Sequence, residues 1–194
     1  MLFDDDAINF QLSYTYVNGL SMESIVFTNF NELCVAARDV ASLRYYEHVP
    51  AGNAKDAEKF RDVSVNGADR AYDTHCSFSV LNLQISDDGK LLLAATDKGR
   101  NIVFETGTPH IVRNLYGHSA SPFSNPRACF SAAGGYVIGS SEDNKIMVWD
   151  LRDGKIIRTY ENVHHGTIRD MNICGGIVVT CSFDKSVKIW MSGI

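Results

Sequence analysis

Short apolar runs alternate with polar turns along this chain, and the pattern repeats most clearly in its last third. Residues 139–150 and 180–191 each hold an apolar run, a short polar turn and an alternating run that closes on a tryptophan. This arrangement predicts a β-hairpin, because strands alternate apolar and polar side chains and tight turns favour polar residues. In both copies the tryptophan, Trp149 or Trp190, follows a turn aspartate by six positions.

Two fainter copies of the hairpin precede this pair. Residues 35–46 and 93–104 keep the apolar run and the turn aspartate, but another aromatic residue replaces the tryptophan and the turn reads one residue longer. The four turn aspartates are Asp39, Asp97, Asp143 and Asp184. They are 58, 46 and 41 residues apart, and a four-stranded propeller blade takes roughly 40 to 45 residues. The chain is therefore predicted to contain about four repeated sheets.

The first interval is longer than the others because it holds an insertion. Residues 51–70 are polar and charged, which is typical of a surface loop with room for a helical turn. Such a loop is either a tolerated insertion or a contact for a partner.

One stretch carries a motif as well as a period. Gly117-His118 is followed about thirty residues later by Trp149-Asp150, with Asp143 in the turn between them. This stretch resembles the glycine-histidine to tryptophan-aspartate pattern of the WD-repeat family. The resemblance covers residues 113–190, and before residue 113 it rests on order and spacing. It implies an all-β fold of propeller blades, divided into an N-terminal strand (1–20), a blade with the insertion (21–75), two further blades (76–117 and 118–160) and an incomplete blade (161–194).

The resemblance also implies a structural role for several polar residues. In WD repeats a histidine, a strand hydroxyl, the turn aspartate and the strand tryptophan form one buried hydrogen-bond network. The last repeat supplies all four, as His164, Thr180, Asp184 and Trp190. The third supplies only His118, Asp143 and Trp149, because Gly139 stands at the hydroxyl position, and we expect that blade to be looser. The first two repeats keep only their aspartates, so apolar packing is expected to hold them.

Four repeats are too few for the seven or eight blades usual in this family, so we expect a partial ring or arc. The last repeat has three predicted strands and lacks its outer one, unless the alternating segment 10–17 supplies it. Four arrangements stay open: a four-blade ring closed by the chain's own ends, an arc completed by a second copy, an arc completed by a different polypeptide, or a piece of a longer chain.

Composition excludes several other classes. The chain has 194 residues, 45% of them apolar, and a net charge of −5 with no stripe of lysine and arginine, which argues against nucleic acid as a partner. No apolar run approaches the roughly 18 residues that cross a bilayer, and the chain opens on an acidic run, so an intracellular protein, cytoplasmic or nuclear, without a membrane partner is expected. The odd cysteine count and the lack of CxxC spacing predict buried free thiols, namely Cys34, Cys76, Cys129, Cys174 and Cys181.

The surface best suited to function is the blade face that carries the loops leading into each sheet. In WD repeats the residue just before the turn aspartate tends to point outward there, and the loop 119–126 is longer than usual. The candidates for this interaction face are Arg38, Phe123, Arg127, Glu142, Arg169 and Phe183, with Thr96 at the corresponding position of the second repeat. Phe183 is the best anchor, because exposed aromatic residues dominate many interfaces; packing against a neighbouring blade is its alternative role.

The favoured function is thus a non-catalytic scaffold that binds proteins within a larger complex. A half-propeller or fragment completed by another copy or another chain is the alternative. A metal-dependent hydrolase is a remote alternative that rests on six histidines and the pair His164-His165. Catalytic and nucleotide-binding fingerprints are absent from the sequence, so neither a cofactor nor a bound metal is expected.

Overall fold

The computed structural model describes residues 19–29, 32–47, 60–70, 73, 75–121 and 124–191, which form four antiparallel sheets in chain order. The first sheet contains β1 (Met22–Asn29), β2 (Glu32–Ala37), β3 (Ser42–Glu47) and β4 (Phe60–Ser64). The second contains β5 (Val80–Ile85), β6 (Leu91–Thr96), β7 (Arg100–Glu105) and β8 (Ile111–Tyr116). The third contains β9 (Ala128–Phe130), β10 (Tyr136–Ser141), β11 (Lys145–Asp150) and β12 (Ile156–Tyr160). The last contains β13 (Ile168–Cys174), β14 (Ile177–Ser182) and β15 (Val187–Met191).

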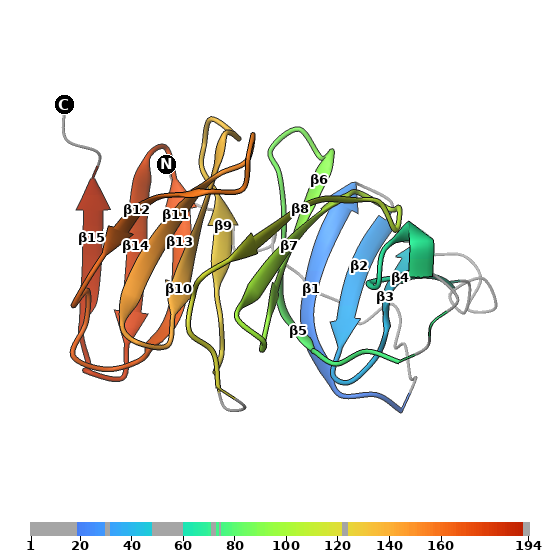
Figure 1. Ribbon diagram of the computed structural model, residues 1–194, viewed down its shortest axis with the longest axis horizontal. Helices are drawn as coiled ribbons and strands as arrows, with labels where there is room; N and C mark the ends of the chain where they lie inside the picture. The colour runs from blue at the N-terminus through green and yellow to red at the C-terminus, as the bar shows by residue number, and fades with distance from the viewer. Residues whose placement is uncertain are drawn as a thin grey trace, which may run out of the picture.

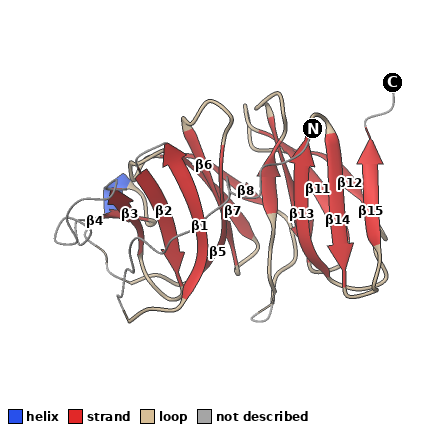
Figure 2. Cartoon of the chain, turned by 180° about the vertical axis from the view of Figure 1, so that it is seen from behind, coloured by secondary structure: helices blue, strands red, loops and turns tan. Residues whose placement is uncertain are grey.

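The four sheets follow one another in a row, with β15 near one end and the first sheet at the other (Figure 1). The reverse view shows the same order (Figure 2). The prediction of an all-β chain with about four propeller sheets in an open arc is therefore confirmed. The segment 10–17, expected to cover the edge of the last sheet, lies outside the described residues.

Each sheet is a simple meander, because every strand pairs with its neighbour in sequence. The turns between the second and third strands hold a residue with positive φ, namely Asp39, Gly99, Asn144 or Lys185. Aspartate, asparagine and glycine tolerate this left-handed conformation better than most residues. The aspartate, asparagine and glycine residues from which these turns were predicted thus also suit the backbone conformation that the turns adopt.

The core lies between the sheets, where apolar side chains of one sheet meet those of the next. One cluster joins the first and second sheets through residues such as Leu43, Tyr45, Leu92 and Phe104. Corresponding clusters join the second sheet to the third and the third to the last. The first two sheets, which lack the polar network, are held together largely by this packing.

The insertion prediction was partly wrong, since residues 60–64 are not loop. They form β4, the outer strand of the first sheet, where Leu43 pairs with Val63 and Tyr46 with Phe60. A 3-10 turn follows at Ala68–Arg70. Residues 51–59 lie outside the described part of the chain.

The strand register corrects one alignment made from the sequence. Ala95 pairs with Asn101 across the second turn, and Ser140 pairs with Ile146 across the third. Both turns therefore have the same length, and the residue equivalent to Asp143 is Lys98 rather than Asp97. Thr96, expected on the outer face, is instead fully buried, and its hydroxyl donates to the Arg100 carbonyl oxygen over 2.5 Å.

Candidate interaction surface

The last sheet brings together the four residues proposed as its hydrogen-bond network. His164 Nδ1 lies 2.9 Å from an Asp184 carboxylate oxygen, and His164 Nε2 lies 2.8 Å from Thr180 Oγ1. Trp190 Nε1 donates to Thr180 Oγ1 over 3.1 Å. His164 and Thr180 are buried. The chain of contacts fastens the loop before β13 to the turn between β14 and β15.

The contacts define where the protons of this network lie. A carboxylate only accepts, so His164 Nδ1 donates to Asp184, and in the neutral imidazole Nε2 accepts from the Thr180 hydroxyl. The Ser186 hydroxyl and the His165 backbone N–H also donate to Asp184, over 2.6 and 3.0 Å. These donors, led by Ser186, hold the pKa of Asp184 well below its usual range. The carboxylate is thus kept ionised to anchor the turn.

The third sheet does not form the network expected of His118, Asp143 and Trp149. Trp149 Nε1 donates instead to the Tyr116 carbonyl oxygen over 2.8 Å, and the carboxylate of Asp143 accepts from Ser141 and pairs with Lys145. Neither ring nitrogen of His118 has a hydrogen-bond partner among the described residues. Its ring meets Trp149 edge-on, with centroids 5.8 Å apart.

Gly139 accounts for this difference. Because it has no hydroxyl, nothing links the histidine to the tryptophan. The space is occupied: a Cβ on Gly139 would lie 3.0 Å from Trp149 Cζ3 and 3.2 Å from Asn101 Nδ2. Trp149 and Asn101 are fully buried there, so the third sheet packs closely on the second although the polar network is missing.

Burial changes the protonation behaviour of His118. The side chain is 5% exposed, and loss of hydration lowers its pKa to about 4, against the opposing attraction of Asp143. The imidazole is therefore neutral at neutral pH.

A different polar link joins the first two sheets. The Ser79 hydroxyl donates to Asp39 over 2.9 Å, and the Ser79 backbone N–H donates to Asp97 over 2.8 Å. The Asp39 N–H returns a hydrogen bond to Ser79 Oγ over 3.1 Å. Both aspartates thus stabilise the junction between neighbouring turns. Sequence reasoning missed Ser79 because no motif marks it.

All the turns between second and third strands lie at the same end of their sheets as the loops that lead into each first strand. In the last sheet, for example, Ile168 at the start of β13 pairs with Ser182 at the end of β14. We call this end the loop surface and define it by the turns 38–41, 97–99, 142–144 and 183–186 with the loops 75–79, 117–121 and 161–167.

Phe183 is the most prominent apolar side chain of the loop surface, with 67% of its area exposed. The guanidinium of Arg169 lies 4.6 Å from the centre of its ring. The Phe183 backbone N–H donates to the Thr167 carbonyl oxygen over 3.2 Å. The turn beneath it is the one that Asp184 and His164 hold, so a fixed backbone presents an exposed aromatic ring.

The other predicted contact residues are engaged to different degrees. Arg38 is exposed and paired with Glu23. Glu142 accepts from the Ser121 hydroxyl over 2.7 Å. Arg127 is directed inward: its guanidinium contacts Asn125, the Leu81 carbonyl oxygen and Asp170. It ties three sheets together and is a poor candidate for a partner contact, while Phe123 lies outside the described residues.

A small space lies on the loop surface between the third and last sheets. The space lined by Ser119, Asn125, Glu142 and Thr167 measures about 10 Å³, close to the least that one water molecule needs.

The cysteines form neither a disulfide nor a metal site among the described residues. All five thiols are free, but only Cys34 and Cys129 are buried, and Cys174 is exposed, so the prediction of buried thiols was partly wrong. Burial raises the pKa of Cys34 and of Cys129 to about 12, which keeps both thiols protonated. Within the described residues no three metal-ligating side chains gather, and no helix there is long and apolar enough to cross a bilayer.

Comparison with known proteins finds similarity to a repeat family in the second half of the chain. The model described as "WD domain, G-beta repeat" matches residues 110–150 and 154–191. The chain is 31% identical to COMPASS component SWD2 of Saccharomyces cerevisiae over 90 residues, which are 42% of this chain and 27% of that protein. It is 32% identical to mitochondrial division protein 1 of Neurospora crassa over 88 residues, 45% of this chain and 12% of that protein. The chain thus spans about a quarter or less of these relatives.

Two solved structures share the fold. The computationally designed Ika4 protein superposes with a TM-score of 0.67 at 22% identity, covering 96% of this chain and all of that one. The designed Ika8 protein superposes with a TM-score of 0.63 at 22% identity, covering 88% of this chain and 46% of its own.

Proposed function

Since this chain carries WD40 repeats on the sheets of an open β-propeller arc, we propose that it is a non-catalytic scaffold that binds proteins through its loop surface. The observation that carries the proposal is the exposed Phe183 ring on a turn that buried hydrogen bonds hold. A rigid aromatic anchor loses little conformational freedom on binding.

The neighbourhood of Phe183 suggests what it would contact. Arg169 stacks on one side of the ring. An apolar side chain of the partner would cover the ring, while polar groups around that side chain would meet Arg169. Such mixed contacts are typical of protein–protein interfaces with an apolar centre and a polar rim.

The relatives support this role in general terms. SWD2 is named as a component of COMPASS, so a protein with similar repeats belongs to an assembly. For this chain we propose an intracellular location, cytoplasmic or nuclear. We also propose that the buried histidines and turn aspartates have structural roles, because the hydrogen bonds of His164 and Asp184 are taken up within the turn.

The test is capture of partners from a cell lysate by the immobilised chain, followed by quantitative mass spectrometry. Phe183→Ala should reduce recovery of the specific partners about tenfold or more, because an anchor residue contributes about 2 kcal/mol or more. The matched control is Ile157→Ala, which removes an exposed apolar side chain from the outer strand β12. Circular dichroism verifies that both variants fold, and equal recovery by Phe183→Ala and the unsubstituted chain would refute this binding surface.

A further inference from the structure

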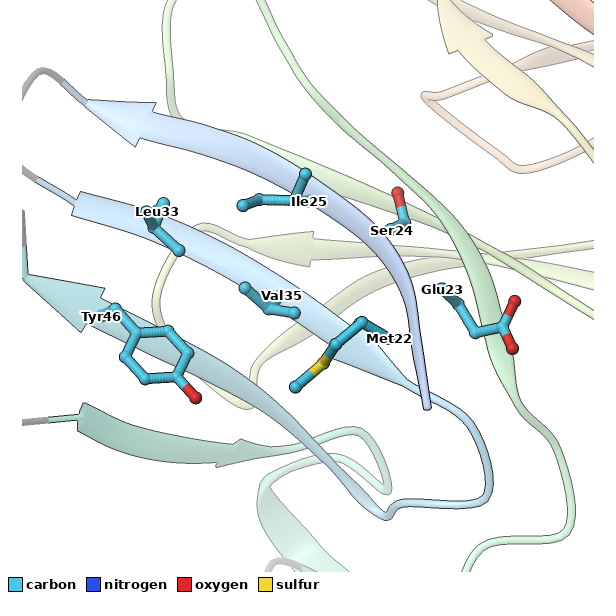
Figure 3. Close-up of a pocket in the computed structure, with 7 residues that line it drawn as sticks. All are labelled: Met22, Glu23, Ser24, Ile25, Leu33, Val35 and Tyr46. Carbon is cyan, nitrogen blue, oxygen red and sulfur yellow. The ribbon is translucent and has the colours of Figure 1, made fainter. Parts of the chain in front are cut away.

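The two ends of the arc each present a bare apolar sheet face. The first-sheet face consists of Met22, Ile25, Phe27 and the half-buried Leu33, and it borders a groove of about 340 Å³ over β1 to β3 that the buried Val35 also lines (Figure 3). The last-sheet face consists of Ile177, Val179, Val187, Ile189 and Met191. Ile25 is 62% exposed and Ile189 67% exposed. Apolar faces of this extent mark contacts with another surface.

Strand register shows which face of the first sheet is bare. Leu33 pairs with Tyr46 just as Leu92 pairs with Phe104 in the second sheet and Val137 with Trp149 in the third. The side chains of Leu92 and Val137 are buried, each against the sheet that precedes its own. The first-sheet face therefore has the positions that elsewhere pack on a preceding sheet.

The last-sheet face corresponds to the other side of a sheet. Val179 pairs with Ile189 just as Leu93 pairs with Val103 in the second sheet and Cys34 with Tyr45 in the first. Leu93 and Val103 are buried against the third sheet, and Cys34 and Tyr45 against the second. The last-sheet face therefore has the positions that elsewhere pack on a following sheet.

The two bare faces are thus the two halves of the contact that the chain already makes between its own sheets. We propose that the last-sheet face of one copy packs against the first-sheet face of a second copy, so that two copies complete one ring. Such a contact joins different surfaces of identical chains, and it stops at two copies if the rotation closes. Two copies of the four sheets would together give eight sheets, which lies within the range of about four to eight blades in known propellers.

A recurring hydrogen bond between inner strands fits the same contact. Ser24 Oγ accepts the Leu83 N–H over 2.9 Å, and Asn82 Oδ1 accepts the Ala128 N–H over 3.3 Å. By register, Asp170 stands at the position of Ser24 and Asn82, since it pairs with Cys181 as they pair with Ala36 and Ala95.

The same register identifies the donor that a second copy would offer. Ile25 pairs with Val35 as Leu83 pairs with Ala94, so it stands at the donor position. The 70% exposed Asp170 side chain would therefore accept the Ile25 N–H of the second copy. Every sheet junction would then have a polar contact beside its apolar core.

The test is the mass of the full chain in solution, measured by light scattering and sedimentation equilibrium over a broad dilution series. The expected species is a dimer of twice the 21.5 kDa chain mass. Ile25→Lys and Ile189→Lys should each give a monomer, because a buried lysine in an apolar interface is strongly unfavourable. An equimolar mixture of the two variants should recover one intact junction and form a heterodimer.

Comparing the two variants alone and mixed distinguishes this contact from other ways of forming a dimer. If only one of the two variants became monomeric, the contact would join like faces, and if both stayed dimeric, the contact would involve neither face; either result would overturn the proposal. A monomeric unsubstituted chain at all concentrations would equally overturn it and would leave these faces to a different polypeptide. Ile157→Lys and Phe183→Ala are the controls: both should remain dimeric, so this result is independent of partner binding at the loop surface. The dilution series of the unsubstituted chain needs no variant and decides the matter even if a lysine variant fails to fold.

Discussion

Thr180 connects the two aromatic members of the network in the last sheet, since its hydroxyl accepts the Trp190 N–H and lies 2.8 Å from His164 Nε2. Thr180→Val keeps the shape but leaves both partners unsatisfied, so it should lower the free energy of unfolding by about 1 to 3 kcal/mol. Urea denaturation measures this. Thr159→Val, on the exposed strand β12, is the matched control and should change stability by less than about 0.5 kcal/mol. Equal effects of the two substitutions would show that the network contributes nothing.

His118 should give the protein a pH-dependent stability. Its pKa is about 4 in the folded chain and 6.5 ordinarily, so the unfolded chain binds a proton first as the pH falls. The contribution is fully present above about pH 6.5 and is lost between there and about pH 4, by up to ~1.4 kcal/mol per pH unit. Urea denaturation across this range should show a steeper loss for the unsubstituted chain than for His118→Gln.

His110 provides the control for this measurement. It is exposed, so His110→Gln should leave the pH profile of stability unchanged. The Asp184 carboxylate does not interfere, because its pKa is depressed below the ordinary 3.8 and its contribution is lost only at lower pH. Parallel profiles for His118→Gln and the unsubstituted chain would contradict a neutral buried imidazole.

At the scale of elements, the junction between the second and third sheets shows that packing can replace a hydrogen-bond motif. Gly139→Thr would restore the family pattern in β10, yet we expect it to destabilise the fold by about 1 to 3 kcal/mol, because the added atoms meet Trp149 and Asn101. Thermal denaturation measures the effect. Gly135→Thr is the control, since a Cβ there meets nothing within 4 Å. A higher melting temperature for Gly139→Thr would mean that the hydroxyl matters more than the space.

At the scale of the whole molecule, each of the two middle sheets has a neighbouring sheet on both sides, whereas each end sheet has a neighbour on one side only. The second sheet buries both faces within the chain. The third sheet packs only partly on the last, since a space of about 390 Å³ lies between Ile138 and Val178, and Ile25 and Ile189 remain exposed at the two ends. The loop surface depends on hydrogen bonds inside each sheet and between neighbours, so it is separate from the end faces. Binding at one surface and association at the other can therefore be tested independently.

The sequence by itself determined the repeated hairpins, the number of about four sheets and the composition of the last network. These features depend on local spacing along the chain. Alternating apolar and polar residues predict the strands, and clusters of polar residues predict the turns. Trp190 follows Asp184 by six positions, as Trp149 follows Asp143. Even so, the alignment of Asp97 with Asp143 was wrong, because a shift of one residue in a turn becomes visible only through the paired strands.

Only the tertiary structure decided which polar groups find partners and which faces stay bare. Arg127 turns inward because acceptors from the second and last sheets surround it. Among the described residues His118 finds no hydrogen-bond partner, because Gly139 offers no hydroxyl and Asp143 is engaged with Ser141 and Lys145. Residues 60–64 form a strand because β3 offers them an edge. Each outcome depends on atoms far apart in sequence, and only the folded arrangement of sheets brings those atoms within contact distance.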